Sequence, residues 1–220
     1  MDVLGVVLRA FDACLDAVLP PRGRAARTKA RSIGDVPLFP TTHALLGTQI
    51  TTVMDYQNPV ARDLIRALKY DGSGAAAALA AEALADYLRE EIANAKQFSP
   101  REILLVPIPL HRSRKRERGF NQIEIVLKAL PKEFHDGTIS RLAPEVLVRA
   151  KATKQQTKLS RRERLRNVVD AFEVPDISRV ENSHVFLIDD VATTGATLKC
   201  AALPLEKCGA RVTLLALARA

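Results

Sequence analysis

Two neighbouring carboxylates end an apolar run in this chain and precede a segment rich in small hydroxyl side chains. Asp189 and Asp190 follow VFLI and are followed by VATTGATL. Adjacent carboxylates resist joint ionisation unless hydrogen-bond donors or a cation compensate them. A sugar diol and a divalent metal ion are both suitable partners. The pair therefore indicates a ligand site, and a capped turn with two solvated aspartates is the purely structural alternative.

The residues after the acid pair suit a phosphate group. Hydroxyls and closely approachable backbone N–H groups come just before a predicted helix, at Thr193, Thr194, Gly195, Ala196 and Thr197. A helix N-terminus binds anions through its free amides and its dipole. Carboxylates for a diol beside amides for a phosphate describe a clamp for a ribose 5-phosphate. The segment is not a Walker A loop, because GxxxxGK[ST] occurs nowhere in the chain.

An apolar strand must position the acid pair. The run 185–188 is apolar on both faces, which predicts a central strand, and open α/β sheets bind ligands at the carboxyl ends of their strands. Side chains alternate along a strand, so both aspartates reach one ligand only if the chain turns, as 192–195 predicts. Strands are predicted at 50–56, 103–106, 146–150, 185–188 and 212–217, and helices at 2–19, 58–70, 74–96, 121–130, 160–169 and 197–208. This alternation predicts an α/β fold with a mainly parallel sheet flanked by helices.

Two basic segments suit a charged ligand. Residues 106–122, VPIPLHRSRKRERGFNQ, follow a predicted strand, and their loop carries His111, Arg112, Arg114, Lys115, Arg116 and Arg118. Arginine presents paired donors to phosphate oxygens, so one or two of these cations suit a pyrophosphate, and a solvated charge run explains the rest. Residues 149–174 are polar, basic and long, which is typical either of a mobile cover that excludes water or of an ordinary helical excursion.

The four apolar residues, two acidic residues and TTGxT resemble the 5-phosphoribosyl-1-pyrophosphate (PRPP) motif of type I phosphoribosyltransferases. From about residue 50 to 220 the chain resembles the ComF family, whose pattern has a PxP loop leading to RGFNQ, then R-x-x-x-T-x-x-Q-x-x-L-S-x-x-x-R-x-x-N ending in AF, then the PRPP motif. These positions are Pro107, Pro109, 118–122, Arg149, Thr153, Gln156, Leu159, Ser160, Arg164, Asn167, Ala171 and Phe172. LIRALKYDG at 64–72 and the final AxAR at 216–219 also fit.

This resemblance implies a type I phosphoribosyltransferase fold with a small N-terminal hood, and it implies roles for individual residues. The implied catalytic residues are Asp189, Asp190, Thr153 and Gln156. The implied PRPP contacts are Asp189, Asp190, Val191, Ala192, Thr193, Thr194, Gly195, Ala196 and Thr197, together with His111, Arg112, Lys69 and Arg118. Magnesium (Mg2+) is the implied cofactor, held directly or indirectly by Asp189 and Asp190. Residues 149–167 are expected to close over the pyrophosphate.

The chain departs from the family pattern near its N-terminus. Members often carry a cysteine zinc ribbon just after a leading helix. Here the helix ends at Leu19-Pro20-Pro21, and a basic linker takes the place of the ribbon. We therefore expect a helix and linker over 1–48 and a phosphoribosyltransferase-like domain over 49–220.

The overall composition favours anionic partners. The net charge is +8 and the sequence pI is about 9.7, which suits phosphate esters or nucleic acid. Three cysteines without CxxC spacing, Cys14, Cys200 and Cys208, favour a reducing, cytoplasmic setting. No segment has the pattern of a signal peptide or of a membrane span.

The function expected is transfer of a phosphoribosyl group from PRPP to an unidentified nitrogen of a nucleobase or an amine. Two alternatives remain. One is a factor of the competence or DNA-uptake machinery that binds nucleic acid through its basic surface without turnover. The other is a regulator that senses PRPP. The helix at 2–19 indicates packing or a homodimer contact rather than a membrane anchor, because its polar face is acidic.

Overall fold

The computed structural model describes residues 28–110, 112–149 and 171–220. The helices predicted at 2–19 and 160–169 lie outside these residues, as does most of the basic linker. Within the described part, no helix is both long enough and apolar enough to cross a membrane.

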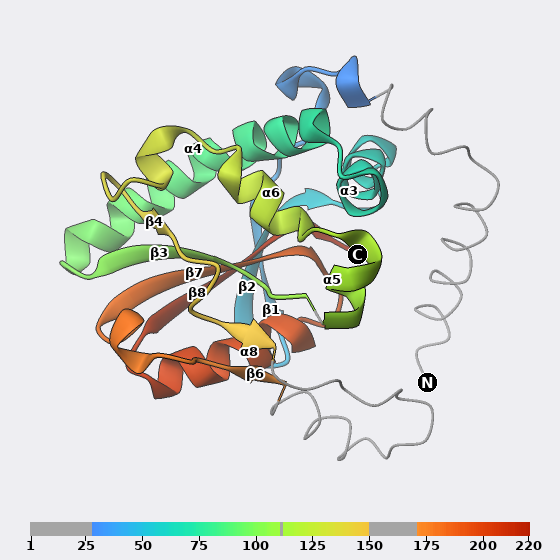
Figure 1. The fold of residues 1–220 in the computed structure, drawn as a ribbon. Helices are drawn as coiled ribbons and strands as arrows, with labels where there is room; N and C mark the ends of the chain where they lie inside the picture. The colour runs from blue at the N-terminus through green and yellow to red at the C-terminus, as the bar shows by residue number, and fades with distance from the viewer. Residues whose placement is uncertain (1–27, 111, 150–170) are drawn as a thin grey trace.

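A six-stranded sheet runs through the described part of the molecule (Figure 1). Its order is β1-β2-β8-β7-β3-β4, and its strands are β1 (Thr41–Leu45), β2 (Thr48–Asp55), β3 (Glu102–Pro107), β4 (Arg141–Leu142), β7 (Ser183–Ala192) and β8 (Arg211–Arg219). The β1–β2 pair is antiparallel, and every other neighbouring pair is parallel. The predicted α/β class with a mainly parallel sheet is therefore confirmed.

Helices cover both faces of this sheet (Figure 1). One face packs against α3 (Pro59–Asp71), α4 (Gly74–Phe98) and α6 (Gln122–Lys128). The other face packs against α8 (Ala196–Lys207) and a two-stranded sheet of β5 (Val148–Arg149) and β6 (Phe172–Glu173). Phe186 and Ile188 of β7 belong to the first core, and Val185 and Leu187 belong to the second. The strand before the acid pair is thus buried on both faces, as its uninterrupted apolar run predicts.

Local sequence signals fix the ends of the helices near the site. The Asn58 side chain accepts a hydrogen bond from the Val60 amide at 2.9 Å, and Pro59 occupies the first turn, so α3 begins where the capping pattern predicts. The helix ends at Gly72, which adopts φ +56°. Ser73 then caps α4 through the Ala76 amide.

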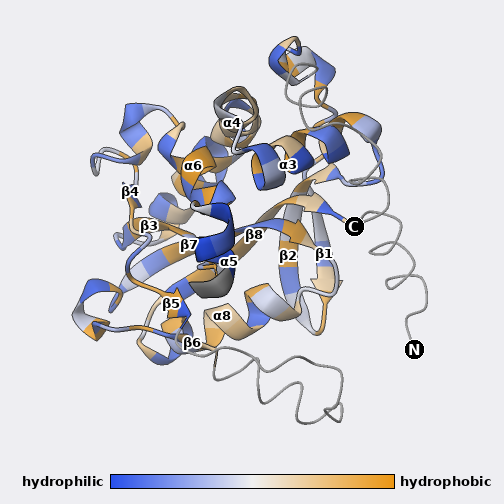
Figure 2. Ribbon diagram, turned by 45° about the vertical axis from the view of Figure 1, so that its right-hand side comes forward, coloured by the Kyte–Doolittle hydropathy of each residue, from blue (hydrophilic) through white to orange (hydrophobic). Residues whose placement is uncertain are grey.

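Three predictions about local structure were wrong in detail. The basic run after β3 is not a loop, because it forms helix α5 (Arg112–Arg118), which Figure 2 shows as strongly hydrophilic. The strand predicted at 146–150 shrinks to β5, which pairs with β6 outside the central sheet. The strand before the acids continues to Ala192, so both aspartates lie within β7 and the chain turns only after them.

The region before residue 48 also has more structure than its lack of periodicity indicates. β1 pairs with β2 along five positions from Thr41 to Leu45. Thr28 is buried, and the Arg31 guanidinium lies 3.4 Å from the Asp63 carboxylate. The described end of the basic linker is therefore held on α3 by Arg31, while Lys29 and Ala30 are exposed as predicted.

Candidate functional site

The acid pair lies where the sheet changes its direction of winding. The chain leaves β3 toward α6 on one face, and it leaves β7 toward α8 on the opposite face (Figure 1). Neighbouring parallel strands whose exits diverge leave a crevice at their carboxyl ends, and this crevice is the usual ligand site of an open α/β sheet. β3 and β7 stay paired up to this point, since the Ile108 amide donates to the Ile188 carbonyl at 2.8 Å.

Backbone amides and one side chain hold the acid pair. The Asp190 amide donates to Asp189 Oδ1 at 2.8 Å, and the Val191 amide donates to Asp190 Oδ1 at 2.7 Å. Gln122 Nε2 donates to Asp190 Oδ2 at 2.7 Å. Burial and the neighbouring Asp190 carboxylate raise the pKa of Asp189 to about 8, against a smaller opposing effect of Lys69. The protein's own donors and cations therefore compensate the negative charge of the pair only in part, which favours a ligand that brings donors or positive charge.

The segment RGFNQ builds the wall facing the acid pair. The Asn121 side chain caps α6 through the Ile123 amide at 3.0 Å and donates to the Ile108 carbonyl at 2.9 Å. Gln122, the next residue, is buried and reaches Asp190 from the first turn of α6. Phe120 covers Gly72, where an added Cβ would lie 2.9 Å from the ring. The ring contact joins RGFNQ to LKYDG, so two separate sequence patterns form one side of the site.

The phosphate segment begins with a tight turn that only glycine fits. Gly195 has φ +75°, and a Cβ there would lie 2.5 Å from Ile50 Cδ1. The Thr193, Thr194 and Thr197 side chains are exposed around this turn. Asp189, but not Asp190, lines a small cavity of about 30 Å³ together with Val191, Ala192, Thr193, Thr194, Gly195, Ala196, Thr197 and Leu198. The predicted phosphate residues thus gather at one cavity at the N-terminus of α8, where free amides favour an anion.

Lys69 and Arg118 both lie close to the ring of an exposed tyrosine. Lys69 Nζ is 5.6 Å and Arg118 Cζ is 5.8 Å from the centre of the Tyr70 ring. Lys69 also acts electrostatically on Asp189, which ties it to the acid pair. No contact of Arg118 with the acid pair is found among the described residues, where its ring contact is with Tyr70.

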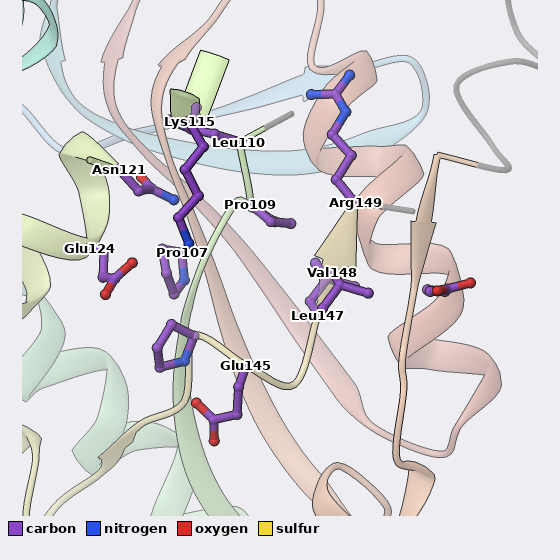
Figure 3. Close-up of a pocket in the computed structure, with 12 residues that line it drawn as sticks. Pro107, Pro109, Leu110, Lys115, Asn121, Glu124, Glu145, Leu147, Val148 and Arg149 are labelled. Atoms are coloured by element: carbon purple, nitrogen blue, oxygen red, sulfur yellow. The ribbon is translucent and has the colours of Figure 1, made fainter. Parts of the chain in front are cut away.

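A larger cavity of about 390 Å³ lies at the carboxyl end of β3 and is lined by residues of α5, α6 and β5 (Figure 3). Arg149 lines it from β5 and packs over the Phe172 ring at 5.2 Å. Burial and Arg114 lower the pKa of the Arg149 guanidinium, while Asp189 acts in the opposite direction. The buried Arg149 Nε has no hydrogen-bond partner within the described structure. A buried donor without a partner is costly, so this cation suits an anionic group brought by a ligand.

Some predicted site residues fall outside this description. His111, Thr153 and Gln156 are not among the described residues, and Arg112 is placed only as the first residue of α5. Across the described ranges, no group of three or more His, Cys, Asp or Glu side chains could hold a metal. The proposed catalytic and metal roles therefore stay predictions.

Gln122 and Arg149 belong to the family patterns in the sequence, but no role in the site was predicted for either residue. A signal for Gln122 was present, because Asn121 is a capping residue type directly before an apolar helical segment. A polar side chain in the first turn of a helix that begins at a strand's carboxyl end points toward the crevice. Its partner could not be read from the sequence, since Asp190 is 68 positions away.

The described geometry can be compared with known proteins. The chain is 34% identical over 153 residues to the DNA utilization protein YhgH of Escherichia coli (strain K12), which covers 68% of this chain and 62% of that protein. It is 37% identical over 107 residues to the competence protein ComFC of Bacillus subtilis (strain 168), covering 49% of this chain and 40% of ComFC. The chain is similar to proteins of the ComF family over about two thirds of its length, at 68%. The chain is also 29% identical over 154 residues to the competence protein ComFC of Streptococcus pneumoniae. This match covers 70% of the chain and 60% of that ComFC.

The chain matches only part of its relatives. It spans about three fifths of the length of YhgH, at 62%. No protein-family model matches it. The resemblance to the ComF family that the sequence patterns indicated is nevertheless confirmed by these relatives.

Proposed function

We propose that this protein binds PRPP and transfers its phosphoribosyl group to a nitrogen nucleophile, in a role related to competence or DNA uptake. The relatives named for competence and DNA utilization support the role. The observation that supports PRPP as the ligand is the position of the acid pair. The pair lies next to the N-terminus of α8, at the switch point of the sheet, and its negative charge is only partly compensated by the protein. Carboxylates for two ribose hydroxyls and amides for the 5-phosphate then lie in the order that PRPP requires.

The acid pair also fits magnesium brought with the ligand. Two carboxylates do not make a complete magnesium site, but Mg2+ is commonly held by one or two carboxylates together with substrate phosphates and water. Asp189 and Asp190 would hold it here, and the bound ion would neutralise charge on the pyrophosphate. The raised pKa of Asp189 is the feature of this chain that such a cation would relieve.

The chain's own residues would act by positioning and by charge. In the transfer, the electron pair of the bond between C1 and the pyrophosphate oxygen leaves with the pyrophosphate. The lone pair of the acceptor nitrogen forms the new C1–N bond, and the proton displaced from that nitrogen goes to water. The positive charge that develops on the ribose ring is stabilised by carboxylates already in place, so Asp189 and Asp190 would serve both binding and catalysis.

Titration calorimetry with PRPP and Mg2+ tests this proposal. We expect a saturable heat for the wild type and an affinity at least about tenfold lower for Asp189→Asn/Asp190→Asn, because the double change removes two charge-assisted partners. Release of pyrophosphate then distinguishes a transferase from a regulator that only senses PRPP. No heat with the wild type, or equal binding by the double variant, would overturn the proposal.

A second candidate function is binding of single-stranded nucleic acid. Tyr70 is 48% exposed, Lys69 Nζ and Arg118 Cζ lie 5.6 Å and 5.8 Å from its ring centre, and α5 carries exposed Arg114, Lys115 and Arg116. Exposed aromatic rings on which bases stack, next to cations that follow the phosphates, are the features that single-strand binders combine. The name of the relative YhgH, a DNA utilization protein, points in the same direction.

Gel-shift titration with single-stranded DNA at several salt concentrations tests the second function. We expect Tyr70→Ala to weaken binding roughly tenfold through the lost stacking, with a steep salt dependence for every variant that binds. Phe98→Ala is the matched control, because Phe98 is an exposed ring on the far end of α4. Equal losses for both variants, or binding that ignores salt, would count against this function.

A further inference from the structure

The larger cavity beside the acid pair has flat apolar walls. Its volume of about 390 Å³ is bounded by Pro107, Pro109, Leu110, Pro144, Leu147 and Val148, and its polar lining is Lys115, Asn121, Glu124, Glu145, Arg149 and Glu173. Three of its wall residues are prolines, which have fixed backbones and no N–H to offer. Rigid walls without donors suit the faces of a planar ring, which needs contact but no hydrogen bonds there.

The cavity is electrically polarised. Figure 3 shows the Arg149 guanidinium at one end and the Glu124 and Glu145 carboxylates away from it. Pro107 of the cavity wall pairs with Ile188, the residue before Asp189, and Asp189 acts electrostatically on Arg149, so the cavity adjoins the acid pair. A ligand that extends from the ribose into this cavity therefore meets two cations, Arg149 and Lys115, and the carboxylates of Glu124 and Glu145.

The Glu124 and Glu145 carboxylates of the lining are hydrogen-bond acceptors, and the Lys115 ammonium is a donor on the same side as Glu124 (Figure 3). Both polar atoms of the Asn121 side chain are committed, to the Ile108 carbonyl and to the Ile123 amide. Glu124 accepts from Lys128 at 2.6 Å, and Glu145 is paired with Arg179. These pairings neutralise much of the charge but leave lone pairs, because an ionised carboxylate has about four acceptor sites. Donors on the ligand would find partners at these carboxylates.

We propose that this cavity binds the acceptor of the transfer, and that the acceptor is an uncharged heterocyclic base carrying an exocyclic amino group. This inference rests on the proposed phosphoribosyl transfer. The amino group would donate to Glu124 or Glu145, and the ring would lie against the proline, leucine and valine walls. Ammonia would leave such a cavity almost empty.

The test compares acceptors at saturating PRPP and Mg2+ by measuring pyrophosphate release. The amino-bearing probes are adenine and cytosine, and the comparison probes are uracil, orotate and ammonium. Glu124→Gln should raise the KM for the preferred amino-bearing base roughly tenfold, because it replaces a charged acceptor by a neutral one. Lys128→Gln is the matched control: it breaks the same exposed ion pair but does not line the cavity, so its KM should match that of the wild type.

A second variant keeps the test decisive if Glu124→Gln proves insensitive. Val148→Trp places a large side chain into the cavity and should abolish turnover, while PRPP affinity by calorimetry should stay within about twofold of the wild type. Turnover with orotate or ammonium in preference to adenine and cytosine would overturn the inference. So would unimpaired turnover by Val148→Trp. If PRPP binds normally but no amino-bearing base reacts, the acceptor inference fails and PRPP binding stands. If PRPP itself gives no heat, the proposed function fails first.

Discussion

Replacement of Gly195 by alanine is expected to lower the free energy of unfolding by about 2–4 kcal/mol, from left-handed backbone strain and overpacking together. Gly195 has φ +75°, and the added Cβ would lie 2.5 Å from Ile50 Cδ1 and 3.0 Å from Leu45 Cβ. Ile50 is fully buried in the second core, so it has little room to retreat. Urea denaturation, with the slope of the transition compared between variants, measures the loss.

Gly47 provides a control that separates strain from crowding. It has φ +74°, almost the same as Gly195, but nothing lies within 4 Å of an added Cβ. Gly47→Ala should therefore cost only about 1 kcal/mol, the part that comes from the left-handed backbone. If the two variants lose equal stability, close packing of the phosphate turn against β1 and β2 is not what requires glycine there.

The second large effect is expected in the dependence of stability on pH at Asp189. Burial and Asp190 raise the pKa of Asp189 from 3.8 to about 8. Between these values the folded protein holds a proton that the unfolded chain has released. The free energy of unfolding therefore falls as the pH rises from about 4 to about 8, and the stabilising contribution of the protonated form is lost above that range.

Asp189→Asn removes this titration, because asparagine stays neutral and resembles the protonated acid in shape. We expect the variant and the wild type to be equally stable near pH 4 and the variant to be clearly more stable at about pH 8. Urea melts at five or six pH values, without PRPP or Mg2+, measure the difference. Burial lowers the pKa of His184 to about 4. Because His184 is present in both proteins, its contribution to the pH dependence cancels in the difference between them. A constant difference across the range would contradict the raised pKa.

The main elements could be predicted from the sequence because local signals agreed with the packing. The run 185–188 is apolar at every position, and β7 proves to be buried on both faces. The Asn58-Pro59 pair and Gly72 mark the ends of α3, and their geometry follows from capping and from a positive φ. The glycine and threonines after the acid pair were correctly placed between a strand and a helix for the same reason.

Contacts between distant segments could not be predicted in this way. The hydrogen bond from Gln122 to Asp190 depends on how α6 packs against β7, and no local pattern encodes that distance. The run RSRKRER was predicted as a loop because its charge pattern indicates exposure, and exposure alone does not exclude a helix. β1 was missed since three of its five positions are exposed and it pairs only on one side.

The ring of Phe120 against Gly72 makes two positions of the chain interdependent. Any side chain at the position of Gly72 would press on the tip of the Phe120 ring, 2.9 Å from the added Cβ, and a residue smaller than phenylalanine at position 120 would relieve this contact. The two positions are therefore expected to change together over evolution, although 48 residues separate them in the numbering. Grafting one of these segments onto a homologue without the other would shift the helix that carries Gln122.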